Sequence, residues 1–265
     1  VVYNSIISEH SFPVYDIDTN NHFASTLNFS RLGRLRPGYG YINVEDNTKG
    51  NLAPSDDGVW ICDLKLNEKH LIVTLRQLQN FYTISSMHNS EHYVNHLCFN
   101  PSGNRLLFFH IWYDGKKKNC RGLVCDIDGR NLILLNEGRS ISHFTWKNDQ
   151  ELLITGEGYN GFGYFLIDLQ NSNSRPVSGD KILNRDGHPS FFKDGNMFIT
   201  DTYPSQFFNF QSLNIIGLDG TAKTIAKVYS PFSYRGEYRC DLHPRLSKDF
   251  RMVCVDLPDI DGRKL

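Results

Sequence analysis

The sequence has no apolar run near the ~20 residues that a membrane-spanning helix needs, so we expect no insertion into a bilayer. Its net charge is only −1, with both signs interspersed, and this balance gives no support for binding nucleic acid. Stretches with a helical period are scarce, and the clearest is LIVTLRQLQNFYTI, residues 71–84. The high aromatic content of 13% then favours an all-β protein with a substantial core.

The six cysteines lack the Cys-x-x-Cys spacing of a zinc site. Most lie in apolar strand patterns, where a buried thiol behaves as a small hydrophobic group. We therefore expect neither a zinc cluster nor a disulfide framework, and a reducing, cytoplasmic location fits this usage. The first residues, VVYNSII, read as a strand and not as a signal peptide.

What the sequence does contain is a repeat in which a histidine opens a short pattern, at His96, His143, His188 and His243. In each copy a large apolar residue follows three positions later, and then come a polar turn and an apolar run. The copies recur about every 45–55 residues, which is the period of a four-stranded propeller blade. Hairpin signals such as Asp128-Gly129 lie between them.

We therefore predict an all-β fold, a β-propeller of four-stranded blades of the WD40 and TolB-like kind, as a single domain over residues 1–265. Complete modules should begin near residues 11, 91, 139 and 183, and a fifth near Pro231 should stop after its inner hairpin. Because an open ring exposes unpaired sheet edges, we expect the chain to be a piece of a longer protein, incomplete at its C-terminal end and lacking N-terminal modules. About six or seven blades would complete the ring.

The repeat histidines are expected at the entry of each inner strand, on one face of the disc, because this strand lines the central channel. Several imidazoles at one mouth suit a divalent-metal site or an acid–base site. Alternatively, each histidine bonds a neighbouring blade and serves packing alone. The sequence favours neither of these two interpretations.

Acidic residues accompany the histidines. Asp241 and His243 would alternate along a strand, so that both face one side and hold one metal, or Asp241 would bond the next blade. Asp201 and Asp256 end two inner hairpins, and a glycoside hydrolase of the five-bladed type would need such carboxylates to project inward. We expect both at the far edge of their blades, so this function ranks third.

The segment RLGRLRPGYGY, residues 31–41, is predicted to be a basic, aromatic loop or extended stretch. Guanidinium groups bind carboxylates bidentately and tyrosines stack on sugars, which makes Arg34, Arg36 and Tyr39 candidate contacts for an acidic saccharide. Tyr203 and Arg245 are candidate substrate contacts as well. Arginines that bridge blades explain the segment equally well.

The segments VNHLCFNPSG, SHFTW, GHPSFFKDG and LHPRLSKD around the repeat histidines resemble the oligogalacturonate lyases, a pectate lyase-type family of seven-bladed β-propellers. The resemblance spans about residues 91–256. RLGRLRPGYGY and TDTYP also resemble uncharacterised propellers related to these lyases and associated with bacterial polysaccharide genes.

The resemblance implies a metal site, because a blade histidine and a Gln…His-x-His group hold manganese in the lyases. His188, Asp241 and His243 would then be the ligands of a divalent metal such as manganese. Asp241 stands where the lyases have a histidine, and no glutamine occupies the matching upstream position.

The implied reaction is β-elimination at a uronic acid of an acidic oligosaccharide or polysaccharide. His96 or His143 would transfer the proton or orient the substrate, and Arg239 would bind the carboxylate. The His-Glu-Gly motif of the lyases reads His110-Ile111-Trp112 here, so its base does not carry over. The alternative is a non-catalytic propeller that binds a polysaccharide or a partner protein. No oligomeric state follows from the sequence.

Overall fold

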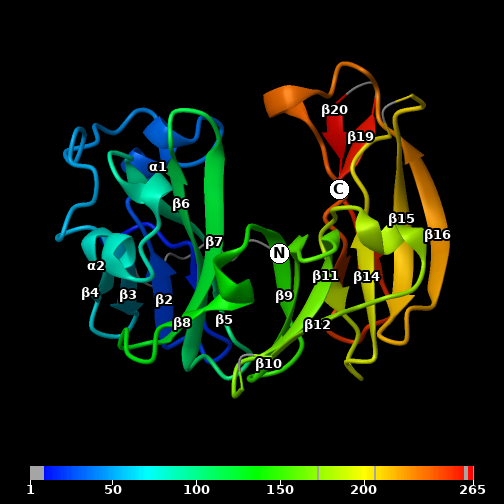
Figure 1. The fold of residues 1–265 in the computed structure, drawn as a ribbon, viewed down its shortest axis with the longest axis horizontal. Coiled ribbons are helices and arrows are strands. Elements are labelled where there is room, and N and C mark those ends of the chain that lie inside the picture. Colours follow the sequence, from blue (N-terminus) through cyan, green and yellow to red (C-terminus); the bar gives the residue numbers. More distant parts are fainter. Residues whose placement is uncertain (1–8, 172, 206, 260–261, 265) are drawn as a thin grey trace. The chain divides into compact units, whose positions relative to one another are not determined.

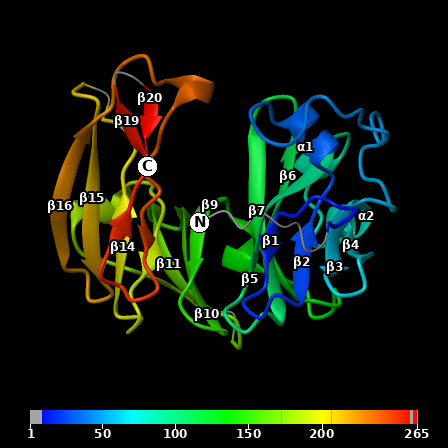
Figure 2. The ribbon, with the colours of Figure 1, turned by 180° about the vertical axis from the view of Figure 1, so that it is seen from behind.

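The computed structural model describes residues 9–171, 173–205, 207–259 and 262–264. The chain divides into two compact units, Val1–Leu134 and Leu135–Leu265. In the first unit, drawn from blue to green in Figures 1 and 2, two antiparallel sheets each follow chain order. Their strands are β1 (Asp16–Ile17), β2 (Phe23–Thr26), β3 (Gly58–Asp63) and β4 (Glu68–Thr74), then β5 (His92–Phe99), β6 (Arg105–Tyr113), β7 (Lys118–Asp126) and β8 (Ile133–Leu134).

The second unit repeats this arrangement twice and continues into two short strand pairs. Its four-stranded sheets comprise β9 (Ile141–Trp146), β10 (Glu151–Gly158), β11 (Gly161–Asp168) and β12 (Asn173–Pro176), then β13 (Ser190–Phe191), β14 (Met197–Asp201), β15 (Phe210–Gly217) and β16 (Ala222–Tyr229). The pairs are β17 (Arg245–Leu246) with β18 (Val253–Cys254), and β19 (Leu257–Asp259) with β20 (Gly262–Lys264).

The all-β prediction and its four-stranded modules are thus confirmed, with first strands β1, β5, β9 and β13 close to the expected starts. The fifth inner hairpin exists as β17 and β18, whereas the β19–β20 pair was not predicted. The turn predicted at Asp128-Gly129 joins β7 to β8, and a Cβ on Gly129 would overlap the carbonyl oxygen of Ile72. Only glycine fits there, with a φ of 81°.

Two short helices lie in the first unit, with the 3₁₀ turn η1 (Ser85–Met87) after them. Helix α2 (Leu75–Asn80) falls inside the expected helical stretch and begins with a capping box formed by Thr74 and Gln77. Helix α1 (Phe29–Leu35) corrects the prediction for residues 31–41, since half of that segment is helical and not extended. Asn28 caps α1 by accepting the Arg31 N–H. Among the described residues, no helix is long and apolar enough to cross a membrane.

Apolar side chains join successive modules of the second unit. Leu153, Tyr164 and Leu166 of the β9–β12 sheet pack against Phe198 and Ile216 of the β13–β16 sheet. A second cluster packs the β13–β16 sheet against the β17–β18 hairpin through Ile199, Leu213 and Leu242, with Leu246 and Val255 beside them. These two layers hold the first strands of three consecutive modules next to one another. The unit also contains the 3₁₀ turns η2 (Leu135–Gly138), η3 (Lys181–Asn184) and η4 (Gly236–Tyr238).

The first unit contains a buried chain of hydrogen-bonded polar side chains next to α2. The Arg121 Nε–H donates to His110 Nδ1 at 3.1 Å, and His110 Nε2 lies 2.8 Å from His92 Nδ1. His92 Nε2 lies 3.0 Å from the carbonyl oxygen of Met87. Because the guanidinium can only donate and the carbonyl can only accept, both imidazoles are neutral and carry their proton on Nε2. The remaining Arg121 donors reach the carbonyl oxygens of Leu78, Phe81 and Tyr82.

This buried chain predicts a loss of stability in acid. Burial lowers the pKa of His92 from its ordinary 6.5 to about 4, and burial beside Arg121 lowers the pKa of His110 as well. The unfolded state therefore binds more protons, so stability is fully present above about pH 6.5 and is lost as the pH falls through 4. We expect the free energy of unfolding to drop by roughly 3 kcal/mol for His92 alone.

Urea unfolding between about pH 7 and pH 4, followed by the fluorescence of Trp112 beside the two rings, measures this loss. The variant His70→Gln, at an exposed position, is the control and should show the same decline. A free energy of unfolding that does not change over this range would contradict the assignment of two neutral, buried imidazoles.

Candidate functional site

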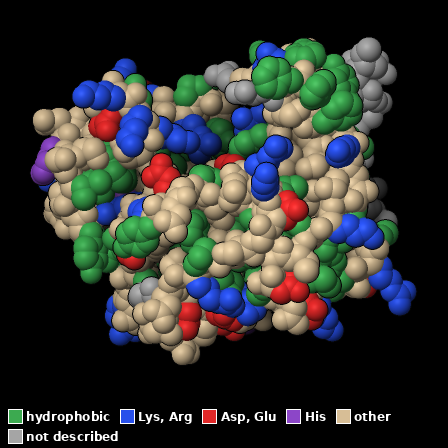
Figure 3. Space-filling view, turned by 45° about the vertical axis from the view of Figure 1, so that its right-hand side comes forward, with side chains coloured by type: hydrophobic (Ala, Val, Ile, Leu, Met, Phe, Trp, Pro, Cys, Tyr) green, Lys and Arg blue, Asp and Glu red, His purple; other side chains and the backbone are tan. Residues whose placement is uncertain are grey.

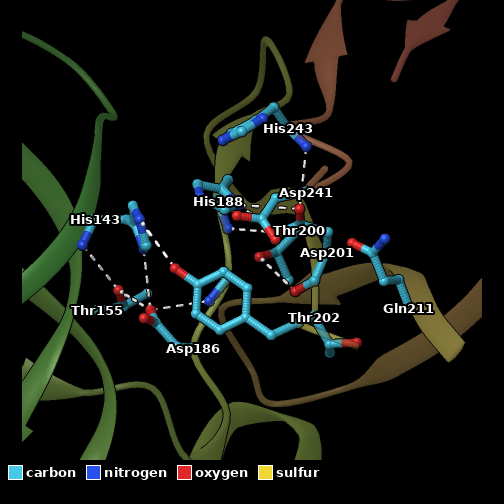
Figure 4. Close-up of polar contacts among 12 residues, drawn as sticks. His143, Thr155, Asp186, His188, Thr200, Asp201, Thr202, Gln211, Asp241 and His243 are labelled. Atoms are coloured by element: carbon cyan, nitrogen blue, oxygen red, sulfur yellow. Dashed lines mark hydrogen bonds and ion pairs between the residues drawn. The ribbon is translucent and has the colours of Figure 1, made fainter. Parts of the chain in front are cut away.

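Three of the four repeat histidines lie side by side in the second unit. His143 is in β9, and His188 and His243 lie two residues before the first residues of β13 and β17. Their ring centroids are 4.0 Å apart from His143 to His188 and 4.1 Å apart from His188 to His243 (Figure 4). The repeat places each ring at the start of an inner strand, and the packing of the three modules then brings the rings together.

His96, the fourth repeat histidine, belongs to the first unit. It lies in β5 at an irregularity where the pairing with β6 shifts between Asn95 and Cys98, and its φ is 55°. Its ring packs against Phe109, with the centroids 4.9 Å apart. The proposed role of His96 in proton transfer stays a prediction.

Each of the three neighbouring histidines has an aspartate at its Nδ1 atom. The Nδ1-to-carboxylate distances are 3.1 Å for His143–Asp186, 3.0 Å for His188–Asp201 and 3.3 Å for His243–Asp256. An ionised carboxylate can only accept, so Nδ1 carries the proton and Nε2 presents a lone pair. This is the arrangement that orients a histidine as a metal ligand or a base.

The prediction that Asp201 and Asp256 lie at the far edge of their blades is wrong. The second strand of an inner hairpin runs antiparallel to the first, so the end of β14 returns to the start of β13. Asp201 therefore accepts the backbone N–H of His188 at 2.7 Å, and it also accepts the backbone N–H of His243 at 3.0 Å. Asp256 returns in the same way, with its N–H bonded to Leu242.

Asp186 connects two modules. It belongs to the segment before β13 but accepts hydrogen bonds from Ser142 and Thr155 of the preceding sheet, as well as from His143. Burial raises the pKa of Asp186, but the hydrogen bonds from His143, Ser142 and Thr155 outweigh it and bring the pKa to about 2. Burial lowers the pKa of His143, so this imidazole is neutral near neutral pH.

The residues predicted as metal ligands meet in the structure. One ligand atom each of His188, Asp241 and His243 lies within 4.8 Å of the other two. The expected strand alternation is not the reason, because residues 241–244 are irregular and His243 has a φ of 41°. The turn at His243 and the hairpin return of Asp201 place the two imidazoles beside the Asp241 carboxylate.

Arg239 forms a bidentate ion pair with Asp241, at 2.8 Å from Nε and 2.8 Å from Nη2. Its guanidinium also lies over the ring of Tyr203, 4.2 Å from the centroid. The predicted substrate clamp thus holds a carboxylate of the protein itself. The Arg239 side chain is 42% exposed, so the group also reaches solvent.

Tyr203 follows Asp201 closely in the chain and lies against the histidine row, which is formed by His143, His188 and His243. Its hydroxyl is 3.4 Å from His143 Nε2, and its ring meets that of His188 edge-on at 5.8 Å. Burial raises the pKa of Tyr203, so the phenol keeps its proton. Since Nε2 presents a lone pair, the hydroxyl is the donor.

Gln211 is a residue of the site that sequence reasoning missed. This fully buried side chain of β15, labelled in Figure 4, donates from Nε2 to the carbonyl oxygen of Cys240, the residue before Asp241, at 2.9 Å. Among the described residues its Oε1 has no hydrogen-bond partner. A glutamine within the apolar strand FQSLNII was the available signal.

The other predicted contacts lie outside this row. Arg34 is held by Asp46 and Glu91, each at 2.7 Å, which is the bridging role that the sequence left as an alternative. Arg36 stacks over Tyr39, 3.9 Å from its centroid, in the first unit. Arg245 opens β17 in the second unit and is exposed. Positive and negative side chains are interspersed over the face in Figure 3.

No protein-family model matches the chain, and no curated protein sequence matches it. Among solved structures, an oligogalacturonate lyase in complex with manganese has a TM-score of 0.54 and 18% identity, over 77% of this chain and 51% of that one. TolB from Acinetobacter baumannii has a TM-score of 0.50 and 14% identity, over 78% and 45%. The chain spans about half the length of these structures. At such identities the likeness shows the fold: the four sheets are β-propeller blades.

The carboxylate pairing predicts the tautomers of all three histidines. Two-bond ¹H–¹⁵N spectra near neutral pH should show His143, His188 and His243 as the Nδ1–H form, each assigned by a single glutamine substitution. In Asp201→Asn, His188 should lose this preference, and stability should fall by about 1–3 kcal/mol because a buried acceptor is lost. Asp194→Asn, in an exposed turn, is the matched control. An Nε2–H tautomer for His188 in the unchanged chain would refute the assignment.

Proposed function

We propose that the second unit holds a divalent metal through His188, Asp241 and His243 and acts on a uronic-acid-containing oligosaccharide by β-elimination. The observation that carries this proposal is the convergence of three ligand atoms within 4.8 Å. Two of them belong to imidazoles whose Nδ1 atoms are paired with Asp201 and Asp256, which leaves Nε2 to serve as the ligand. The similar lyase structure with manganese agrees with this choice of metal.

The donor set fits such an ion. Two neutral imidazole nitrogens and one carboxylate oxygen are ligands that manganese and its neighbours accept. Asp241 is already paired with Arg239, but a carboxylate offers about four lone-pair sites and can serve both. When bound, the cation supplies positive charge that stabilises the substrate carboxylate and so acidifies the C5 proton.

The chain's own residues provide the proton transfers. His143 takes the C5 proton on Nε2, while Asp186 holds the Nδ1–H and stabilises the imidazolium. The electron pair of the C5–H bond forms the C4–C5 double bond, and the C4–O bond breaks. Tyr203 gives its proton to the leaving oxygen, and His143 Nε2–H, 3.4 Å away, restores it. Both groups thereby return to their starting states.

A non-catalytic propeller that binds a polysaccharide or a partner protein is the second candidate. The observation in its favour is the Arg239–Asp241 ion pair, which neutralises the carboxylate needed for the metal. A glycoside hydrolase is not proposed, because Asp201 and Asp256 are both committed to histidine Nδ1 atoms. An acidic saccharide partner and a cytoplasmic location remain predictions of the sequence.

Metal content tests the proposed ligands. After equilibration with manganese chloride and gel filtration, the chain should retain one ion per molecule by elemental analysis. His188→Ala/His243→Ala should lose it, and Asp241→Asn should bind manganese at least about tenfold more weakly. His70→Ala, at an exposed position of the first unit, should retain the metal. If the chain retains no metal, the proposed mechanism is wrong, and the non-catalytic binding propeller becomes the favoured function.

Product formation tests the proton-transfer roles. With uronic-acid oligosaccharides and manganese, the chain should generate the ultraviolet absorbance of an unsaturated uronate. His143→Gln should lower the rate by about 10²–10⁴-fold while leaving the metal content unchanged, because it removes only the base. Tyr203→Phe should lower the rate and also keep the metal. Activity that survives His143→Gln would assign the base elsewhere.

A further inference from the structure

A pocket of about 390 Å³ lies in the second unit, apart from the three ligand atoms of the metal group. It is enclosed by the loop that leads into β9, by the turn between β10 and β11, and by the segment that runs from β12 into η3. Pockets for small ligands occupy ~300–1,000 Å³, so the volume suits one or two sugar rings.

Three side chains form the rim as a single group. The Tyr159 hydroxyl donates to Glu137 at 2.5 Å, and the same carboxylate accepts from Arg139 at 2.8 Å. The Arg139 guanidinium covers one face of the Tyr159 ring, 3.7 Å from its centroid. Tyr159 is nevertheless 83% exposed, so its other face is open to solvent. A large aromatic ring held in place while exposed is a platform for a ligand.

The rim loop is strained. Asn136 and Glu137 have consecutive positive φ values of 50° and 52°, a conformation that non-glycine residues rarely adopt. The contacts of Glu137 described above and the bond from Asn136 Nδ2 to the carbonyl oxygen of Glu157 hold it there. Strain that is maintained by several contacts is characteristic of binding sites.

Missing side chains create the space. Gly161 and Gly163 line the pocket, and a Cβ on Gly161 would meet nothing within 4 Å. A Cβ on Gly163 would meet Leu183 and Phe165 at ordinary distances of 3.6–3.8 Å. A methyl group therefore fits at Gly163, and because this residue lines the pocket, a larger side chain is expected to take up part of its volume. Phe162 and Phe165 contribute half-buried apolar surface.

The pocket lies at the same end of the sheet as His143. Gly156 pairs with Ile141 at the start of β9, so the turn after β10 lies beside the entry of the strand that carries His143. Asn184 lines the pocket, and Asp186, two residues later, bonds His143. Two residues span at most ~7 Å, so an extended ligand can occupy both places.

We infer that this pocket binds a neutral sugar residue of the polysaccharide whose uronate reacts at the histidine row. A pyranose has an apolar C–H face for the open face of Tyr159 and hydroxyls for the exposed amides of Asn160 and Asn184. Arg139 is neutralised by Glu137, and Asp180 adds a further negative charge to the lining. This balance disfavours a uronate there. The link to a reacting uronate rests on the proposed function, whereas sugar binding at the pocket does not.

Saturation-transfer NMR and titration with the methyl glycosides of glucose, galactose, mannose and N-acetylglucosamine test this inference, with sodium galacturonate as the charged comparison. At least one neutral glycoside should bind, and more tightly than galacturonate. Tyr159→Ala and Gly163→Val should each weaken that binding at least about tenfold, by loss of the platform and by filling of the pocket. Tyr113→Ala, an exposed tyrosine of the first unit, is the matched control and should bind unchanged.

His188→Ala/His243→Ala should retain glycoside binding, because the assay needs neither metal nor turnover. The proposed reaction can therefore be disproved while sugar binding at the pocket is confirmed, and sugar binding can be disproved while the reaction is confirmed. The inference is overturned if no neutral glycoside binds, if galacturonate binds more tightly, or if binding survives both Tyr159→Ala and Gly163→Val. Circular dichroism checks that Gly163→Val folds, and Tyr159→Ala, at a side chain that is 83% exposed, should fold as well.

Discussion

The hydrogen bond between a histidine Nδ1 and an aspartate carboxylate determines the arrangement of the second unit. Burying an ionised carboxylate costs free energy unless several hydrogen-bond donors satisfy it, and the imidazole N–H is one of those donors. The requirement fixes the ring orientation, the tautomer and the direction of the Nε2 lone pair together. Since Asp186 and Asp201 also accept from neighbouring modules, the same bonds register one blade against the next.

The buried histidines of the first unit, His92 and His110, have the opposite tautomer. There the partner of His110 Nδ1 is Arg121, a donor, so the proton sits on Nε2 and is directed toward His92. That arrangement ends at a backbone carbonyl and leaves no lone pair for a ligand. The chemistry of a histidine in this fold thus depends on whether its partner donates or accepts. The identity of the histidine alone does not decide it.

Much of this could be predicted from the sequence, because regular spacing reports regular structure. The interval between the repeat histidines gave the modules, and the proximity of Asp241 and His243 in the chain gave a candidate ligand pair. What could not be predicted depends on contacts between distant positions. The return of Asp201 to His188, its bond to the backbone of His243 and the bond from Gln211 to Cys240 all require the folded hairpins. The helix over Phe29–Leu35 was missed because its signal was one capping residue, Asn28.

The sharing of Asp201 between His188 and the backbone of His243 has an evolutionary consequence. The β13–β16 module brings both an imidazole, His188, and a carboxylate, Asp201, and that carboxylate is already placed to receive the backbone of the next copy. Such a row can lengthen by gene duplication without inventing a new contact. Divergence is harder, because a change at the shared position alters two copies at once. A residue beside the shared carboxylate, such as Asp241, contacts fewer copies, so new chemistry can arise there with less disturbance of the row.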